Sequence, residues 1–172
     1  MNHLLNETYN LDSIIQELQT TLYETLTAKW DSNKLDAYGR VYKNERDGQI
    51  IPEVYNSSKG DYTEVLFNNQ SCFFFVDDDK HVLDDEDHEF TTDVKIVFML
   101  NLKDLKTSTE RVDADVKRDV LKVLRDNDYQ FIVTEYIKGI DNVLSEFNKI
   151  KFHDIHPMHV FAFKTGFSYS VI

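Results

Sequence analysis

The pattern of apolar and polar positions is clearest between Thr92 and Asn127, where it predicts a long strand followed by an amphipathic helix. In the strand, five apolar side chains recur at a period of two and share one face: Val94, Ile96, Phe98, Leu100 and Leu102. The opposite face is polar at its ends and apolar in the middle, at Val97 and Met99. This arrangement predicts a central strand whose second face is covered in part.

The helix predicted after this strand has a single apolar stripe. Its apolar positions follow helical spacing: Val112, Val116, Val120, Val123 and Leu124. A helix that follows a strand and covers one of its faces makes a two-layer core. The unit therefore indicates the architecture of the protein, but not its function.

A second amphipathic helix is predicted over residues 11–30, after an N-terminal arm of residues 1–10. Its apolar residues recur at steps of three and four: Leu11, Ile14, Ile15, Leu18, Leu22, Leu26 and Trp30. We expect Asn10 or Asp12 to cap its start. One apolar face indicates that this helix packs on something larger, and we expect that to be the sheet.

The next region is rich in strand-like segments. Residues 37–44 and 49–56 flank the sequence Glu-Arg-Asp-Gly, which predicts a hairpin over residues 37–56. Pro52 cannot donate to a strand ladder, so we expect the second arm at a sheet edge or a bulge. Residues 61–69 and 71–77 then read as two further strands.

Residues 77–89 interrupt this pattern with eight carboxylates and one lysine, and so carry most of the net charge of −12. Self-repulsion and few apolar side chains predict an inserted, solvated and mobile loop at residues 77–90. Clustered carboxylates also suit Ca²⁺, but the spacing does not match an EF-hand loop and the run contains no glycine. A charged surface for assembly, or for lining a channel, is the third reading.

The C-terminal part predicts a strand at residues 129–139, a short helix, and a long terminal strand at residues 159–172 built into the sheet. The short helix rests on four apolar positions: Ile140, Val143, Leu144 and Phe147. The whole chain, residues 1–172, is predicted to be one α+β domain. We expect a two-layer fold with a mixed, mostly antiparallel sheet, helices on one face and a projecting hairpin.

Composition narrows the range of functions. The net charge of −12 and the lack of a basic cluster argue against a nucleic-acid clamp. Cys72 is the only cysteine, which rules out an intramolecular disulfide, and its apolar neighbours favour a small core residue over a nucleophile. The N-terminus lacks the pattern of a signal peptide, and no apolar run is long enough to cross a membrane. We expect a soluble protein of a reducing compartment.

Three histidines, His153, His156 and His159, are spaced three residues apart. Such spacing brings side chains together only on a helix, and Pro157 disfavours a helix there. A zinc site is therefore the weaker reading, and polar residues at the entry to the last strand are the stronger one. Because no phosphate-binding, nucleotide-binding or hydrolase motif occurs, we expect no enzymatic activity and no cofactor.

The order of elements and several local segments resemble a known family. The segments are TTDVKIVFMLNLKDL, ADVKRDVLKVL, GIDNVLSEF and HPMHVFAFKTGFSYSV. They resemble the tail-terminator and neck proteins of tailed bacteriophages, including crAss-like phages of Bacteroidetes. The resemblance covers most of residues 11–172 in element order, although no short invariant motif defines the family.

This resemblance implies a structural virion protein without catalytic residues, assembled in the host cytoplasm. It implies a six- or twelve-fold ring in the neck or tail, in contact with portal, neck or tail proteins. DNA would pass through the ring without sequence-specific binding, and no membrane would be involved. A head-completion or stopper protein is the alternative within phages, and a small cytoplasmic enzyme or metal-binding protein is the alternative from another class.

By analogy, the hairpin and the acidic loop become the candidate assembly or channel surfaces. The candidate residues are Tyr42, Arg46, Tyr55, Asp77, Asp78, Asp79, Asp84, Asp85, Glu86, Asp87 and Glu89. Aromatic side chains left over after the core is filled would serve a ring interface, and the further candidates for this role are Tyr38, Tyr62 and Phe67. Strand addition at the edge that Pro52 is expected to occupy is a second route.

Overall fold

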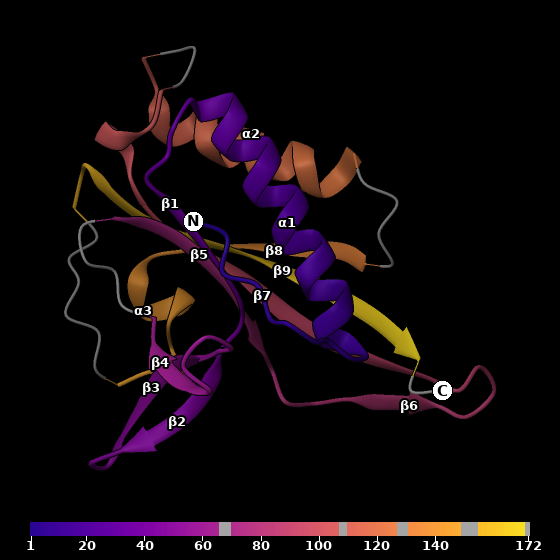
Figure 1. Cartoon of the computed structure of the whole chain (residues 1–172). Helices are drawn as coiled ribbons and strands as arrows, with labels where there is room; N and C mark the ends of the chain where they lie inside the picture. Colours follow the sequence, from indigo (N-terminus) through magenta and orange to yellow (C-terminus); the bar gives the residue numbers. More distant parts are fainter. Residues whose placement is uncertain (66–69, 107–109, 127–130, 149–154, 171–172) are drawn as a thin grey trace.

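A computed structural model describes residues 1–65, 70–106, 110–126, 131–148 and 155–170. Within these ranges the chain forms two sheets and two long helices (Figure 1). The elements in chain order are α1 (Leu11–Trp30), β1 (Leu35–Arg40), β2 (Tyr42–Arg46), β3 (Gln49–Asn56), β4 (Asp61–Glu64), β5 (Ser71–Asp77), β6 (Val82–Asp84), β7 (Glu89–Asn101), the 3₁₀ helix η1 (Leu102–Asp104), α2 (Val112–Asp126), β8 (Phe131–Lys138), α3 (Ile140–Val143) and β9 (Met158–Ser170).

The main sheet has the order β1-β5-β7-β9-β8, and β6 adds to β7 outside this path. Strand β1 runs parallel to β5, and every other pair in this sheet is antiparallel. The prediction of an α+β fold with a mixed, mostly antiparallel sheet is therefore confirmed. The predicted terminal strand is also confirmed, and as β9 it lies between β7 and β8 rather than at an edge.

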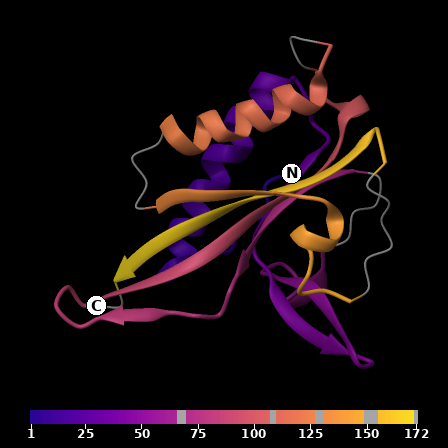
Figure 2. The same cartoon turned by 180° about the vertical axis from the view of Figure 1, so that it is seen from behind.

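The first core layer lies between the main sheet and the two long helices, which both lie on the side of this sheet opposite the small sheet (Figure 2). The face of β7 predicted from its alternation, Val94 to Leu100, is buried in this layer, and Leu102 joins it from η1. The apolar stripes of α1 and α2 supply the opposite side. Alternating side chains of β9, including Phe161 and Phe163, complete the layer.

The second face of the main sheet is covered in part, as the pattern of β7 predicts. Val97 and Met99 are buried there with the short helix α3 and with Val54 of the small sheet. Lys95 also lies on this face, where its ammonium donates to the carbonyl of Val143 at 2.8 Å. Its charge is balanced by Glu146, with Nζ 2.6 Å from Oε1.

The small sheet has the order β2-β3-β4 and projects from the main sheet (Figure 1). The Asp-Gly turn is confirmed: Asp47 and Gly48 form a two-residue turn with φ of 51° and 73°. Both values are positive, as a type I′ hairpin turn requires. The predicted hairpin over residues 37–56 is nevertheless too long, because residues 37–40 belong to β1 of the main sheet and the hairpin begins at residue 42.

The prediction for Pro52 is wrong in its main point, since β3 is the middle strand of the small sheet. The carbonyl of Pro52 accepts a hydrogen bond from the amide of Val65 at 3.0 Å, just past the end of β4. The carbonyl and nitrogen of one strand residue face the same neighbour, so the nitrogen of Pro52 faces β4 where that strand has ended. The missing donor therefore lies just beyond the β3–β4 ladder, whose last pair at this end is Glu53 with Glu64.

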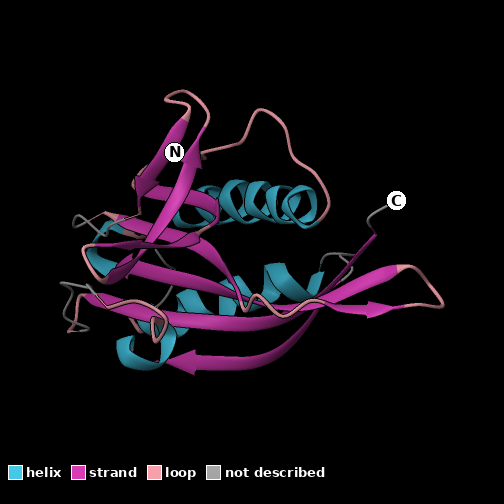
Figure 3. Cartoon of the chain, turned by 90° about the horizontal axis from the view of Figure 1, so that it is seen from below, coloured by secondary structure: helices cyan, strands magenta, loops and turns pink. Residues whose placement is uncertain are grey.

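The predicted loop at residues 77–90 is instead largely a hairpin. Strand β6 pairs with the start of β7, and Glu89 of β7 pairs in turn with Ser170 of β9. These three strands form a tongue that extends beyond the helices (Figure 3). The predicted solvation holds for residues 78–80 and 82–88, which are exposed. Periodic apolar side chains are not needed where backbone pairing alone extends an existing sheet.

The prediction of a side-chain cap on α1 is also wrong. Asn10 precedes the helix with a φ of 53° and makes no capping bond with its side chain. Asp12 instead forms an ion pair with Arg40 of β1. The start of α1 is therefore held by a tertiary contact, which the local sequence does not reveal.

Candidate functional site

The small sheet carries a cluster of three tyrosines on its outer face, one from each strand. Tyr55 of β3 lies directly opposite Tyr62 of β4, and Tyr42 of β2 lies opposite Glu53, two residues before Tyr55. Tyr62 makes edge-to-face contacts with both neighbours, at centroid distances of 5.1 Å to Tyr42 and 5.4 Å to Tyr55. Such contacts favour this arrangement of the rings.

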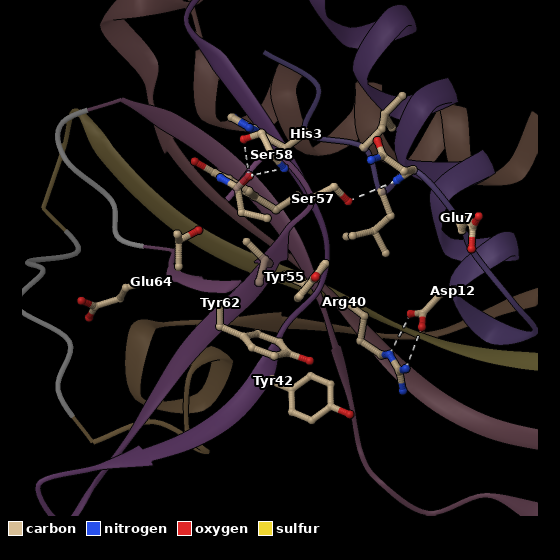
Figure 4. Close-up of a pocket in the computed structure, with 18 residues that line it drawn as sticks. His3, Glu7, Asp12, Arg40, Tyr42, Tyr55, Ser57, Ser58, Tyr62 and Glu64 are labelled. Atoms are coloured by element: carbon tan, nitrogen blue, oxygen red, sulfur yellow. Dashed lines mark hydrogen bonds and ion pairs between the residues drawn. The ribbon is translucent and has the colours of Figure 1, made fainter. Parts of the chain in front are cut away.

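This tyrosine cluster borders a groove of about 840 Å³ (Figure 4). The groove lies between the N-terminal arm, the start of α1, the end of β1 and the small sheet. The arm is tied to both sides: the amide of Asn6 donates to Ser57 at 3.2 Å, and the amide of Leu5 donates to Gln16 at 2.8 Å. The groove is thus bounded by segments that hydrogen bonds hold in place.

The aromatic side chains proposed for assembly differ in how far they are exposed. Tyr38 lies half-buried in the groove, where its ring stacks on His3 at a centroid distance of 4.5 Å. Phe67 lies outside the described residues. Tyr42 and Tyr55 remain substantially exposed, as the sequence predicts for surface aromatic side chains.

Arg40 closes one end of the groove with a pair of hydrogen bonds to Asp12, from Nε at 2.9 Å and from the terminal nitrogen at 2.8 Å (Figure 4). Its other terminal nitrogen lies 3.2 Å from Asp77. Burial alone would lower the pKa of Arg40, but the hydrogen bonds and charges of the two carboxylates raise it above its ordinary value. Each of the three guanidinium nitrogens of Arg40 therefore has a carboxylate partner within the protein.

Arg46, another candidate for the assembly surface, also forms an ion pair within the protein. Its guanidinium lies 2.7 Å from the carboxylate of Glu53, which is buried and also accepts from Asn44 at 3.0 Å. The hydrogen bond from Arg46 lowers the pKa of Glu53, against the opposing effect of burial. Arg46 thus neutralises a buried carboxylate within the small sheet.

The structure divides the predicted acidic residues into three groups. Those around the tip of the β6–β7 hairpin, Asp84, Asp85, Glu86 and Asp87, are exposed, whereas Glu89 is half-buried in β7. Asp78 and Asp79 are exposed after the end of β5, and Asp79 pairs with Lys43 at 2.8 Å. Asp77 is only 3% exposed, so its assignment to a solvated surface is wrong.

Asp77 is buried because it organises the base of the tongue. It accepts hydrogen bonds from Thr92 at 2.9 Å and from Nε2 of His81 at 2.7 Å, in addition to its contact with Arg40. Burial would raise the pKa of Asp77, but the hydrogen bonds from Thr92 and His81 hold it below its ordinary value. A carboxylate with these donors remains charged without contact with bulk water.

The sequence gives no signal for the role of His81, whose second ring nitrogen is hydrogen-bonded to the hydroxyl of Tyr169. Asp77, His81 and Tyr169 therefore form a chain of carboxylate, imidazole and phenol that joins β5, the start of the tongue and β9. Burial, with the charge of Asp77, raises the pKa of Tyr169 above its ordinary value. The contacts between these three side chains therefore help to hold the base of the tongue in place.

The structure describes two of the three histidines that precede or begin β9. His153 lies outside the described residues, and the rings of His156 and His159 have centroids 6.3 Å apart. Among the residues that the structure describes, no three side chains of the metal-binding types gather at one point. Cys72 is buried in β5, where burial raises its pKa to about 12, so it is a core residue as predicted.

Comparison of the chain with protein-family models and with curated protein sequences finds no match. In the described part of the chain, no helix combines the length and the apolar character needed to cross a membrane.

Proposed function

We propose that this protein is a structural component of a tailed-phage virion, without enzymatic activity, that forms a ring in the neck or tail around the DNA channel. One observation supports this proposal most directly: two hairpins project from the fold, and both expose apolar or aromatic side chains. Tyr42 and Tyr55 are 52% and 44% exposed on the small sheet, and Val82 and Leu83 are 65% and 47% exposed on the tongue.

Exposed apolar side chains on projecting strands favour contact with neighbouring chains. Strand β6 pairs only with β7 and strand β8 only with β9, so each leaves one edge unpaired among the described strands. Ile132 of β8 is 73% exposed beside such an edge. A closed ring needs two different surfaces that meet head to tail, and the tongue and the β8 edge are two such surfaces.

The acidic tip of the tongue fits a position near DNA. Its carboxylates repel phosphate over a distance of about 8 Å at physiological salt. A surface that repels DNA allows the polymer to pass without adhering. The same charge also keeps the free subunit soluble before assembly.

Native mass spectrometry and negative-stain microscopy of the purified chain test the proposal. We expect closed rings of one stoichiometry, six- or twelve-fold. A variant that carries both Val82→Asp and Leu83→Asp should reduce ring formation, whereas Glu24→Gln, on the exposed surface of α1, should not. Monomers that remain monomeric at high concentration and with added neck or portal proteins would contradict the proposal.

A further inference from the structure

The groove beside the tyrosine cluster offers open aromatic surface. Tyr42 and Tyr55 flank the half-buried Tyr62, and about half of each flanking side chain remains exposed. The face of an aromatic ring carries partial negative charge and attracts a cation within about 6 Å of its centre. Three rings that already contact one another present this surface with less ordering on binding than three separate side chains would need.

The charged side chains that line the groove are mainly acidic. Of the described residues that line it, Glu7, Asp12 and Glu64 are acidic, and Arg40 is the only lysine or arginine. Asp12 is already paired with Arg40, whose remaining contact is with Asp77. Within the described ranges the carboxylates of Glu7 and Glu64 form no ion pair, and their negative charge disfavours an anionic ligand in the groove.

We infer that the groove binds a lysine- or arginine-bearing segment of a different protein, with the cationic side chain against the tyrosine cluster. The rings of the tyrosine cluster and the carboxylates of the groove both favour a positively charged ligand. An extended peptide can lie along a groove of this size. A second copy is the weaker occupant of this groove, because the tongue and the β8 edge are the surfaces assigned above to contacts between copies. The inference rests on the proposed function only for the origin of the partner, as a neighbouring virion protein.

The test uses the full chain and a capped peptide of alternating glycine and arginine, with citrulline in place of arginine as the neutral control. Calorimetry should show binding of the arginine peptide that weakens as salt rises, and no binding of the citrulline peptide. Amide chemical shifts should change around Tyr42, Tyr55 and Tyr62. Changes confined to the tongue would overturn the inference, because they would indicate attraction to its acidic tip alone.

Substitutions separate the contribution of the rings from that of charge. Tyr62→Leu keeps an apolar side chain without the aromatic face and should weaken binding about fivefold, whereas Tyr62→Phe should bind like the wild type. Glu64→Gln is an exposed change that should leave the fold intact and also weaken binding. The matched control, Glu24→Gln, removes the same charge far from the groove and should have no effect. Equal affinity across these variants would overturn the inference.

Ring formation measured on the same samples keeps this inference separate from the proposed function. Loss of peptide binding in Tyr62→Leu with rings intact supports the groove as a site for a different protein. Loss of rings in Tyr62→Leu, together with wild-type rings that exclude the peptide, would assign the groove to a second copy and overturn the inference. Peptide binding by a chain that never forms rings would contradict the proposed function alone.

Discussion

The indole nitrogen of Trp30 donates a hydrogen bond to the carboxylate of Asp119 over 3.0 Å, and both side chains are buried. This contact joins the last residue of α1 to the middle of α2, above the main sheet. Lys29 lies 3.0 Å from the other carboxylate oxygen and balances its charge from the surface. The two long helices are therefore joined by a hydrogen bond as well as by apolar packing.

Removal of the Asp119 carboxylate should destabilise the fold by leaving the indole N–H without its acceptor. We expect Asp119→Ala to lower the free energy of unfolding by about 2–3 kcal/mol. Asp119→Asn keeps an acceptor and should cost less. Urea unfolding followed by circular dichroism measures both. An equal loss in the two variants would show that the hydrogen bond to Trp30 contributes little.

Acid should weaken the base of the tongue through Asp77. The pKa of this carboxyl is lower in the folded protein than its ordinary value of 3.8, so folding favours its charged form. The resulting stability is fully present above that ordinary value and is lost as pH falls through the lower, folded pKa. Urea unfolding between about pH 2 and pH 6 should show this decline. Asp77→Asn should flatten it, whereas Asp87→Asn at the exposed tip should not.

Charge reversal at the tip of the tongue should spare the fold. Within the described chain, Asp85, Glu86 and Asp87 are exposed and form no ion pair, so lysine at all three should change the unfolding free energy by less than about 0.5 kcal/mol per site. Lysine at position 77 should instead prevent folding, because it would place a cation beside Arg40. We expect the tip variant to bind DNA in a gel-shift assay at low salt, where the wild type does not.

Packing of β9 should dominate stability. Phe163 is buried between the main sheet and the long helices, so Phe163→Ala should cost about 3–5 kcal/mol. Lys164 is its neighbour in sequence but faces outward, where it pairs loosely with Asp93, so Lys164→Ala should cost less than about 1 kcal/mol. Phe98→Asp in β7 should abolish folding altogether. Thermal unfolding compares the first two variants, and circular dichroism should show no folded protein for Phe98→Asp.

The periodicity of the chain predicts the elements that bury a regular face. The helix at residues 11–30 has the predicted bounds, and the faces of β7 and β9 are those that alternation predicts. These elements bury one stripe against one neighbour, so local spacing is enough to identify them. The exposed positions of Tyr42 and Tyr55 agree with the prediction that aromatic side chains in charged strands remain at the surface once the core is filled.

The remaining features depend on contacts between distant parts of the chain. The parallel pairing of β1 with β5, the groove beside the tyrosine cluster and the pairing of β6 all join segments that local patterns do not link. Asp77 and Asp119 are buried because distant donors satisfy them, and a carboxylate in a sequence gives no sign of such donors. Charge density alone therefore misassigns Asp77 to the surface.

The position of β9 has a consequence for synthesis on the ribosome. Strands β7 and β8 are made first, yet they cannot pair with each other in the finished sheet, because β9 separates them. Their facing edges stay open until residues 158–170 have left the exit tunnel. Such open edges are prone to wrong pairing between nascent chains. Expression yield should therefore depend strongly on how quickly residues 158–170 are translated, and slow codons placed just before them should increase aggregation.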